Sequence, residues 1–410
     1  MRFLSKAEID EFLSQRDYDI RKSHNARWID QKCTPDVLTI IADCIANYVA
    51  ENGNDYFTSM DIWHDAYTVD NVESIFKKPN PDETKARNEY DKFFQQPMEL
   101  LAYSGVLEKD KRKTRNFYRV ANEELLEYIS LRDRNALTFL QCYISDVLTD
   151  SGIISKFEHF FKDTSKENFD SLKSDYEDFI IANTPINGRT ECRRIFTKVI
   201  NPLAFLHGTE GTERGHLSKH KITYDMLMYN RDNFRDIYAD KPKEMTRAEY
   251  YLSAGIKINK DLTKYMSAKA KRIVRVYNDQ FRNGITEVLN DERHIGDLAT
   301  NIHHIFPEAD YPTICYYIEN LIALTPTQHF NYAHPNGNTQ SINKEYQHIC
   351  LLAKSATIRE DLENHEEPIY SFDKFLYVLF VGLEKSYFSD IEYGDYDGLV
   401  TAINLAYANQ

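Results

Sequence analysis

The sequence predicts a mainly α-helical protein with small β elements, which is an α+β fold class. Apolar residues recur at helical spacing along most of the chain, and only a few short apolar runs bounded by turn residues are typical of strands. The composition, 42% hydrophobic and 28% charged, is that of a folded globular protein. A length of 410 residues leaves room for two or three domains of roughly 150 residues each.

The chain is expected to begin with an N-terminal helix and arm over residues 1–29. The opening sequence MRFLSKAEIDEFLSQRDYD turns acidic before any apolar stretch could serve as a signal peptide. The basic segment around Trp28 could be an arm laid along a nucleic acid or a strap packed by the tryptophan. The residues alone do not separate these two interpretations.

Residues 30–122 predict three helices followed by a β-hairpin. The first helix has Thr34 as a candidate cap and Pro35 at its first position. The third helix is expected to be interrupted by Pro97 and ended by Gly105. Three helices followed by a hairpin is the order of a winged helix domain.

The turn of this hairpin is strongly basic. A basic hairpin beside a helix suits contacts with DNA phosphates, whereas a charge run is more often only a solvated turn. The net charge of −14 disfavours indiscriminate binding to nucleic acid but permits a local basic surface. The hairpin residues predicted to contact DNA are Lys111, Arg112, Lys113 and Arg115.

A helical region is expected over residues 123–256, with no internal repeat. Its glycine-rich stretch around Gly208, Gly211 and Gly215 lacks the G-K-[ST] ending of a phosphate-binding loop, so a flexible loop with basic residues is expected there.

The last domain is expected over residues 257–410 and begins with a basic helix. Residues 257–282 hold eight Lys or Arg and two Asp, a net charge of +6 in an acidic chain. A basic helix is usually only a solvated face, but here it directly precedes a cluster of histidines. Lys271, Arg272 and Arg275 are therefore predicted to follow a phosphate backbone.

The segment NIHHIFPEADYPTICYYIENLIALTPTQHFNYAH, residues 301–334, contains four of the 13 histidines. It predicts a strand from Asn301, a second strand over ENLIALT, and a helix capped by Thr325. Successive strand residues point to opposite faces, so His303 and His304 cannot both bind one metal ion.

These residues resemble the ββα-metal motif of HNH endonucleases. The resemblance covers about 34 of the 410 residues and consists of the His303-His304 pair, Asn320 and His329 at matching spacing, with His334 beyond. It implies that His303 and His329 are metal ligands. It also implies that His304 is the general base that activates water and that Asn320 holds the loop and orients His304.

The chain departs from the family's pattern at two points. Thr325 and Gln328 stand where many members have a cysteine pair for a structural zinc, so no second zinc is expected. His334 follows His329 by five residues, which on a regular α-helix places them ~140° apart. His334 is either a third ligand, if the helix frays before Pro335, or a phosphate contact.

The resulting expectation is a sequence-specific, divalent-metal-dependent DNA endonuclease, of the kind found in type II restriction. A modification-dependent HNH endonuclease and a winged-helix regulator with a structural metal are the alternatives. One divalent ion per site is expected, Mg²⁺ in the cell, with Mn²⁺, Ni²⁺ or Zn²⁺ as other candidates. The expected partners are double-stranded DNA, a second copy of the chain and a cognate DNA methyltransferase.

The remaining features point to a cytoplasmic protein without membrane contact. The six cysteines are scattered and form no C-x-x-C pair, which disfavours a disulfide framework. The longest strongly apolar run, FLYVLFVGL at residues 375–383, is too short to cross a bilayer and predicts a buried helix.

Overall fold

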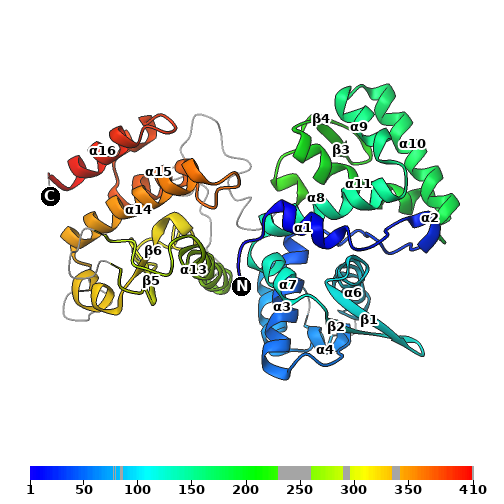
Figure 1. Cartoon of the computed structure of the whole chain (residues 1–410), viewed down its shortest axis with the longest axis horizontal. Helices are drawn as coiled ribbons and strands as arrows, with labels where there is room; N and C mark the ends of the chain where they lie inside the picture. The colour runs from blue at the N-terminus through cyan, green and yellow to red at the C-terminus, as the bar shows by residue number, and fades with distance from the viewer. Residues whose placement is uncertain are drawn as a thin grey trace. The chain divides into compact units, whose positions relative to one another are not determined.

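Figure 1 shows the computed structural model, which describes residues 1–76, 78, 80–83, 86–229, 260–289, 296–334 and 342–408. The described chain is mostly helical, with small two-stranded antiparallel sheets, so the broad α+β class is confirmed. The chain divides into two units, Phe3–Asp240 and Lys241–Gln410. The expected boundary between residues 256 and 257 lies outside the described residues.

The first half of unit 1 contains the predicted helices and hairpin, preceded by two short helices. Its last helix, α7, packs against the first long one, α3. The elements are α1 (Lys6–Leu13), α2 (Ile20–Ser23), α3 (Pro35–Asn52), α4 (Ser59–Trp63), α5 (Ala66–Phe76), α6 (Ala86–Ser104), β1 (Leu107–Arg112), β2 (Arg115–Val120) and α7 (Glu123–Leu131).

Three details of this half differ from the expectation, the first being that four helices, α3 to α6, precede the hairpin where three were expected. Helix α6 runs through Pro97 without interruption, so the predicted break there was wrong. Phe93, Phe94 and Met98 are fully buried around the proline, and we infer that this packing outweighs the hydrogen bond that proline removes. Thr34 precedes α3 but does not cap it, because its hydroxyl donates to Asp36 instead.

The hairpin β1–β2 has the expected form, with Arg112 opposite Arg115 and a two-residue turn between them. An isolated bridge from Phe57 to Tyr118 adds a short third strand segment beside it. Gly105 ends α6 with a φ of +88°, a left-handed conformation that glycine adopts without strain.

The segment around Trp28 is a packed strap. Trp28 is buried, and its carbonyl accepts a hydrogen bond of 2.6 Å from the Tyr143 hydroxyl. Upstream, the backbone N–H of Tyr18 donates to Asp150 at 2.7 Å. Since these contacts hold the segment against α8, the interpretation as a strap packed by the tryptophan is confirmed.

The second half of unit 1 is helical and ends in another hairpin. The glycine-rich stretch forms this hairpin, so the expected flexible loop was wrong; the Arg214-Gly215 turn has two positive φ angles that close it tightly. The elements are α8 (Asp133–Asp150), α9 (Ile154–Lys162), α10 (Lys166–Asn183), α11 (Arg189–His207), β3 (Glu210–Glu213), β4 (His216–Lys221) and η1 (Asp225–Leu227).

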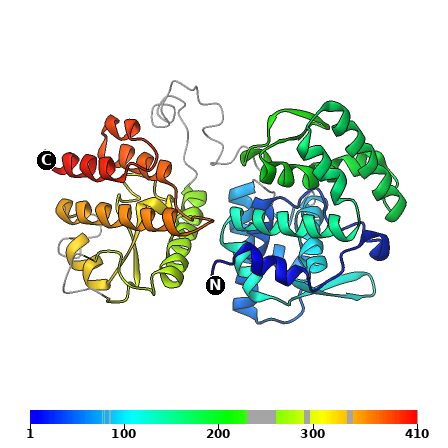
Figure 2. The ribbon, with the colours of Figure 1, turned by 45° about the horizontal axis from the view of Figure 1, so that its top comes forward.

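Unit 2 surrounds a small sheet with helices. The basic helix α13 packs against both strands, while α14 packs against the turn η3 and against α16 (Figure 2). The elements are α13 (Lys260–Phe281), β5 (Asn301–His304), η2 (Ile318–Asn320), β6 (Leu321–Leu324), η3 (Gln328–Ala333), α14 (Lys344–Asn364), α15 (Phe372–Leu383), η5 (Ser386–Asp390) and α16 (Tyr396–Ala408).

The remaining expectations about residue chemistry are met where the structure describes them. The apolar run at residues 375–383 lies in the largely buried helix α15. All six cysteines are buried thiols without a disulfide. Among the described residues, no helix is long and apolar enough to cross a membrane.

A buried ion pair anchors β6. Lys354 on α14 lies 2.8 Å from Glu287, and both side chains are at most 1% exposed. Glu287 also exchanges hydrogen bonds with Ala323 of β6, accepting from its N–H through the carboxylate and donating to its carbonyl through the backbone. Removing either charge would leave the other buried and unpaired, which typically costs several kcal/mol.

The close contact between α15 and the end of β5 leads to a prediction for Gly382. A Cβ there would lie 2.4 Å from the fully buried ring of Phe306. Overpacking of this kind costs ~1–3 kcal/mol, more than the ~1 kcal/mol that alanine gains over glycine in a helix. We expect Gly382→Ala to lower the melting temperature of unit 2 by a few degrees in scanning calorimetry.

If Gly382→Ala melted like the wild type, Phe306 would not be held against α15 as described.

Candidate metal centre

The two adjacent histidines of β5 face opposite sides of the sheet. β5 and β6 are antiparallel, with His303 opposite Ile322 and His304 opposite Leu321. The His303 ring lies 5.1 Å from the His329 ring, whereas His304 lies beside Ser267 of α13. The alternation of side chains along a strand therefore separates the two imidazoles as expected.

A turn of π-helix brings His334 to the same place as His329. Residues Gln328–Ala333 are π-helical, and the N–H of His334 donates to the carbonyl of His329 at 3.2 Å. A bond between residues five apart puts them one above the other. The ~140° separation expected for an α-helix thus does not apply, and His334 itself is extended, with φ −115° and ψ 99°.

The helix begins as the sequence predicted. The Thr325 hydroxyl accepts a hydrogen bond of 3.1 Å from the N–H of Gln328, and Pro326 occupies the first helical position. This cap fixes where the turn starts and so where His329 points.

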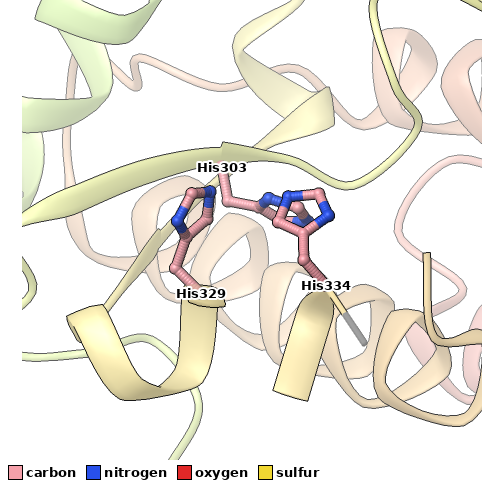
Figure 3. Close-up of side chains that lie close together, drawn as sticks. All are labelled: His303, His329 and His334. Carbon is pink, nitrogen blue, oxygen red and sulfur yellow. The ribbon is translucent and has the colours of Figure 1, made fainter. Parts of the chain in front are cut away.

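The structure brings His303, His329 and His334 together (Figure 3). The three side chains point toward one another, and one ring nitrogen from each lies within 4.8 Å of the others. Around a Zn²⁺ ion with Zn–N bonds of ~2.0–2.1 Å, tetrahedral geometry would bring the nitrogens to ~3.3 Å from one another. The nitrogens would have to approach one another by at most ~1.5 Å, and the three residues could hold a metal ion.

The protonation of the cluster also suits a metal. Burial, followed by the nearby His329, lowers the pKa of His303 well below its ordinary value, and burial likewise lowers the pKa of His329. Neutral imidazole is the form that binds a metal ion. Three imidazoles without a carboxylate suit Zn²⁺ or Ni²⁺ better than the Mg²⁺ expected from the sequence.

The described part of the chain offers three ligands for an ion. Among the described residues, the group that could hold an ion is these three histidines, with no cysteine or carboxylate in it. Structural zinc sites normally have four protein ligands, while catalytic sites have three and leave a position for water or substrate. Three histidines are the number of protein ligands found in sites of the second kind.

His304 is held by its ring nitrogen Nε2. That atom lies 2.9 Å from the carbonyl oxygen of Cys315 and 3.3 Å from the Ser267 hydroxyl. Because a carbonyl oxygen only accepts, Nε2 carries the hydrogen and Nδ1 is left as the acceptor of the neutral ring. Burial, followed by the charge of Lys271, lowers the pKa of His304 to about 4, so the ring is in its basic form at neutral pH.

Asn320 holds the loop that carries the Cys315 carbonyl. Its side chain is fully buried, accepts from the N–H of Phe306 at 2.9 Å, and donates to the carbonyls of Phe306 and Ile314. Both ends of the loop between β5 and η2 are thus tied to one amide. These bonds show that Asn320 holds the loop, as the resemblance implies.

Gln328 was not predicted as a site residue, although it supports the ligand helix. Its side-chain oxygen accepts from the Thr286 hydroxyl at 2.5 Å and from the N–H of Thr325 at 3.0 Å, and the side chain is fully buried. It directly precedes His329. No signal in the sequence could have found this role, because Thr286 is 42 residues away and a lone Thr–Gln pair is common.

The basic residues predicted to contact DNA are in varied environments. In α13, Lys271 is close enough to influence the pKa of three of the four histidines. Arg275 donates to the carbonyls of Ala299 and Thr300, and Arg272 is partly buried. In unit 1, the hairpin residues Lys111, Arg112, Lys113 and Arg115 are exposed.

Comparisons with protein-family models, with curated proteins and with solved structures gave no match to this chain. The metal centre is therefore interpreted from its own geometry.

Metal binding tests the cluster directly. We expect one Zn²⁺ or Ni²⁺ ion per chain, and His303→Ala and His334→Ala should each lower its affinity by at least 10-fold, since each removes a ligand. Isothermal titration calorimetry measures this. His159→Ala, a change at an exposed histidine in unit 1, is the control. Unchanged affinity in His334→Ala would show that His334 is not a ligand.

The buried histidines also predict the stability of the metal-free protein at low pH. His304 has a lowered pKa in the folded state, so the unfolded chain binds its proton first. The contribution of neutral His304 to the free energy of unfolding is fully present above its ordinary pKa of ~6.5. It is lost as the pH falls from there toward 4. With a folded pKa of about 4, this loss amounts to about 2 kcal/mol at pH 5.

The His304→Gln variant should therefore lose less stability between pH 7.5 and 5 than the wild type, because glutamine can still donate to the Cys315 carbonyl but does not titrate. Denaturant-dependent hydrogen exchange of peptides that contain β5 and β6 measures the difference. Equal losses in both proteins would contradict the buried neutral state of His304.

Proposed function

We propose that the protein is a metal-dependent DNA endonuclease of the HNH type, with the reaction at the histidine centre of unit 2. The observation that carries the proposal is that two adjacent histidines of β5 lie on opposite faces of the strand and are suited to different roles. His303 joins His329 and His334 in an open cluster of three imidazoles, while the next residue, His304, presents an unprotonated Nδ1. A metal site and a base on adjacent residues are what hydrolysis of a phosphodiester requires.

The chain's own residues account for the proton transfer. His304 Nδ1 accepts a proton from a water molecule, and the Cys315 carbonyl, held through Asn320, keeps the ring in the required tautomer. The ammonium group of Lys271 supplies positive charge for the phosphate. When bound to His303, His329 and His334, a divalent ion would stabilise the negative charge on the phosphate and on the leaving 3′ oxygen.

Unit 1 supports DNA as the substrate. The order of α3, α4, α5, α6 and the hairpin β1–β2 is compatible with a winged helix domain, with one helix more than expected. The exposed Lys111, Lys113 and Arg115 have no ion-pair partner among the described residues. Cleavage of a palindromic site as in type II restriction would use two chains, because each described chain has one such centre.

Variants of the centre should fail in different ways. His304→Ala should keep metal and DNA affinity but lower the single-turnover cleavage rate by ~10²- to 10⁴-fold, as expected for a lost general base. His303→Ala should lose metal affinity, with cleavage partly restored by excess metal. Asn320→Ala should reduce the rate more than the affinity, because Asn320 orients His304 without binding metal.

Cleavage of plasmid DNA by the purified protein, with Zn²⁺, Ni²⁺, Mn²⁺ or Mg²⁺ and with EDTA as the blank, is the primary assay. Substrates with and without base modification separate a restriction enzyme from a modification-dependent one. Metal binding without cleavage of either substrate would contradict the nuclease and favour a structural metal in a DNA-binding protein.

A further inference from the structure

Unit 1 contains the same order of elements twice. An 18-residue helix, two further helices, a 19-residue helix and a hairpin form the series α3, α4, α5, α6, β1–β2. The series α8, α9, α10, α11, β3–β4 repeats it, again with 18 residues in its first helix and 19 in its last. The short third strand segment at Phe57 belongs to the first series.

The junctions of the two series match as well. Each 19-residue helix contains a proline in its second half, Pro97 in α6 and Pro202 in α11. Each helix is followed by a glycine with positive φ, 88° at Gly105 and 62° at Gly208. Such a series of shared details favours a duplicated helix–hairpin module over two unrelated folds.

The two hairpins also share a basic residue at the tip in a left-handed conformation. Lys113 has a φ of 56° in the first hairpin, and Arg214 has a φ of 51° in the second. A long side chain at this position costs stability relative to glycine or asparagine. Both turns thus have a basic residue at the same strained position. We infer that the positive charge has the same function in the two hairpins.

The second hairpin presents positive charge to solvent. Arg214, Lys219 and Lys221 are exposed and form no ion pair among the described residues. Lys173 on α10 adds a cation at the tip, where its ammonium donates to the carbonyl of Gly215 at 2.6 Å. Of the acidic residues, Glu210 accepts from the Thr164 hydroxyl at the base, and Glu213 is exposed beside the turn.

We propose that the hairpin β3–β4 is a second wing that binds the phosphate backbone of double-stranded DNA through Arg214, Lys219 and Lys221. The proposal rests on the proposed function for the choice of DNA as the ligand. Figures 1 and 2 both draw the two hairpins in separate parts of unit 1, so the two wings contact different phosphates. Their contributions to the binding free energy are then additive.

The test is the salt dependence of DNA affinity in the full chain, measured by fluorescence anisotropy with EDTA present so that no cleavage occurs. Each phosphate contact contributes about −0.9 to the slope of log K against log salt. Replacing Arg214, Lys219 and Lys221 by glutamine should reduce the steepness of the slope by about 2.7. When the salt is raised from 50 to 200 mM, the affinity of this variant should therefore drop by a factor about 40 times smaller than the factor for the wild type.

Three further variants complete the experiment. The glutamine variant of Lys111, Arg112 and Lys113 reports the first wing, and the six-fold variant should show the sum of both effects. The control replaces Lys162, Lys166 and Lys385 by glutamine; these lysines are exposed, form no ion pair among the described residues, and lie outside both hairpins. Its slope should equal that of the wild type. Unchanged melting temperatures show that all the variants fold.

The outcomes separate this proposal from the nuclease. A second-hairpin variant with the slope of the wild type overturns the second wing, even if the protein cleaves DNA. A reduced slope without any cleavage supports the wing and contradicts the nuclease. A slope equally reduced in the control variant shows a general effect of charge and also overturns the proposal, as does a wild type whose DNA affinity does not depend on salt.

Discussion

The site depends on the alternation of side chains along β5. Two consecutive imidazoles cannot share one environment in a strand, so His303 joins the ligand cluster and His304 joins the face covered by α13. Because a single peptide unit links the two residues, backbone geometry limits the distance between His304 and the three-histidine cluster.

Buried polar contacts then hold the two-stranded sheet in place, which an isolated hairpin of this size could not do for itself. Asn320 forms hydrogen bonds within the loop after β5, and Gln328 connects the turn η3 to Thr286. The ion pair of Glu287 with Lys354 holds β6. A buried polar group without its partner costs ~1–3 kcal/mol, so each contact disfavours alternative registers. Rigidity at the centre is thus provided by hydrogen bonds around it.

The sequence was informative where short-range chemistry decides the outcome. The strand with His303 and His304, the cap at Thr325 and the hairpin at residues 107–120 follow from local residue types and were predicted. Helix α6 kept its course through Pro97 because tertiary packing outweighs a local preference.

Long-range contacts and unusual helical geometry were not accessible in the same way. The role of Gln328 depends on Thr286, and the strap at Trp28 depends on a tyrosine more than a hundred residues later. The repeated order of elements in unit 1 was missed because the two series agree in the order of their elements and in the lengths of their first and last helices, while no repeat appears in the sequence.

The π-turn between His329 and His334 also bears on how such a centre can change in evolution. A π-turn contains one residue more than the α-turn it replaces, and both place their first and last residues on one face. Deleting one residue from Phe330–Ala333 would give the i,i+4 spacing of an α-helix and keep the two imidazoles adjacent. The spacing between these ligands can therefore drift by one residue without dismantling the cluster, and a fixed spacing is a poor criterion for finding related sites.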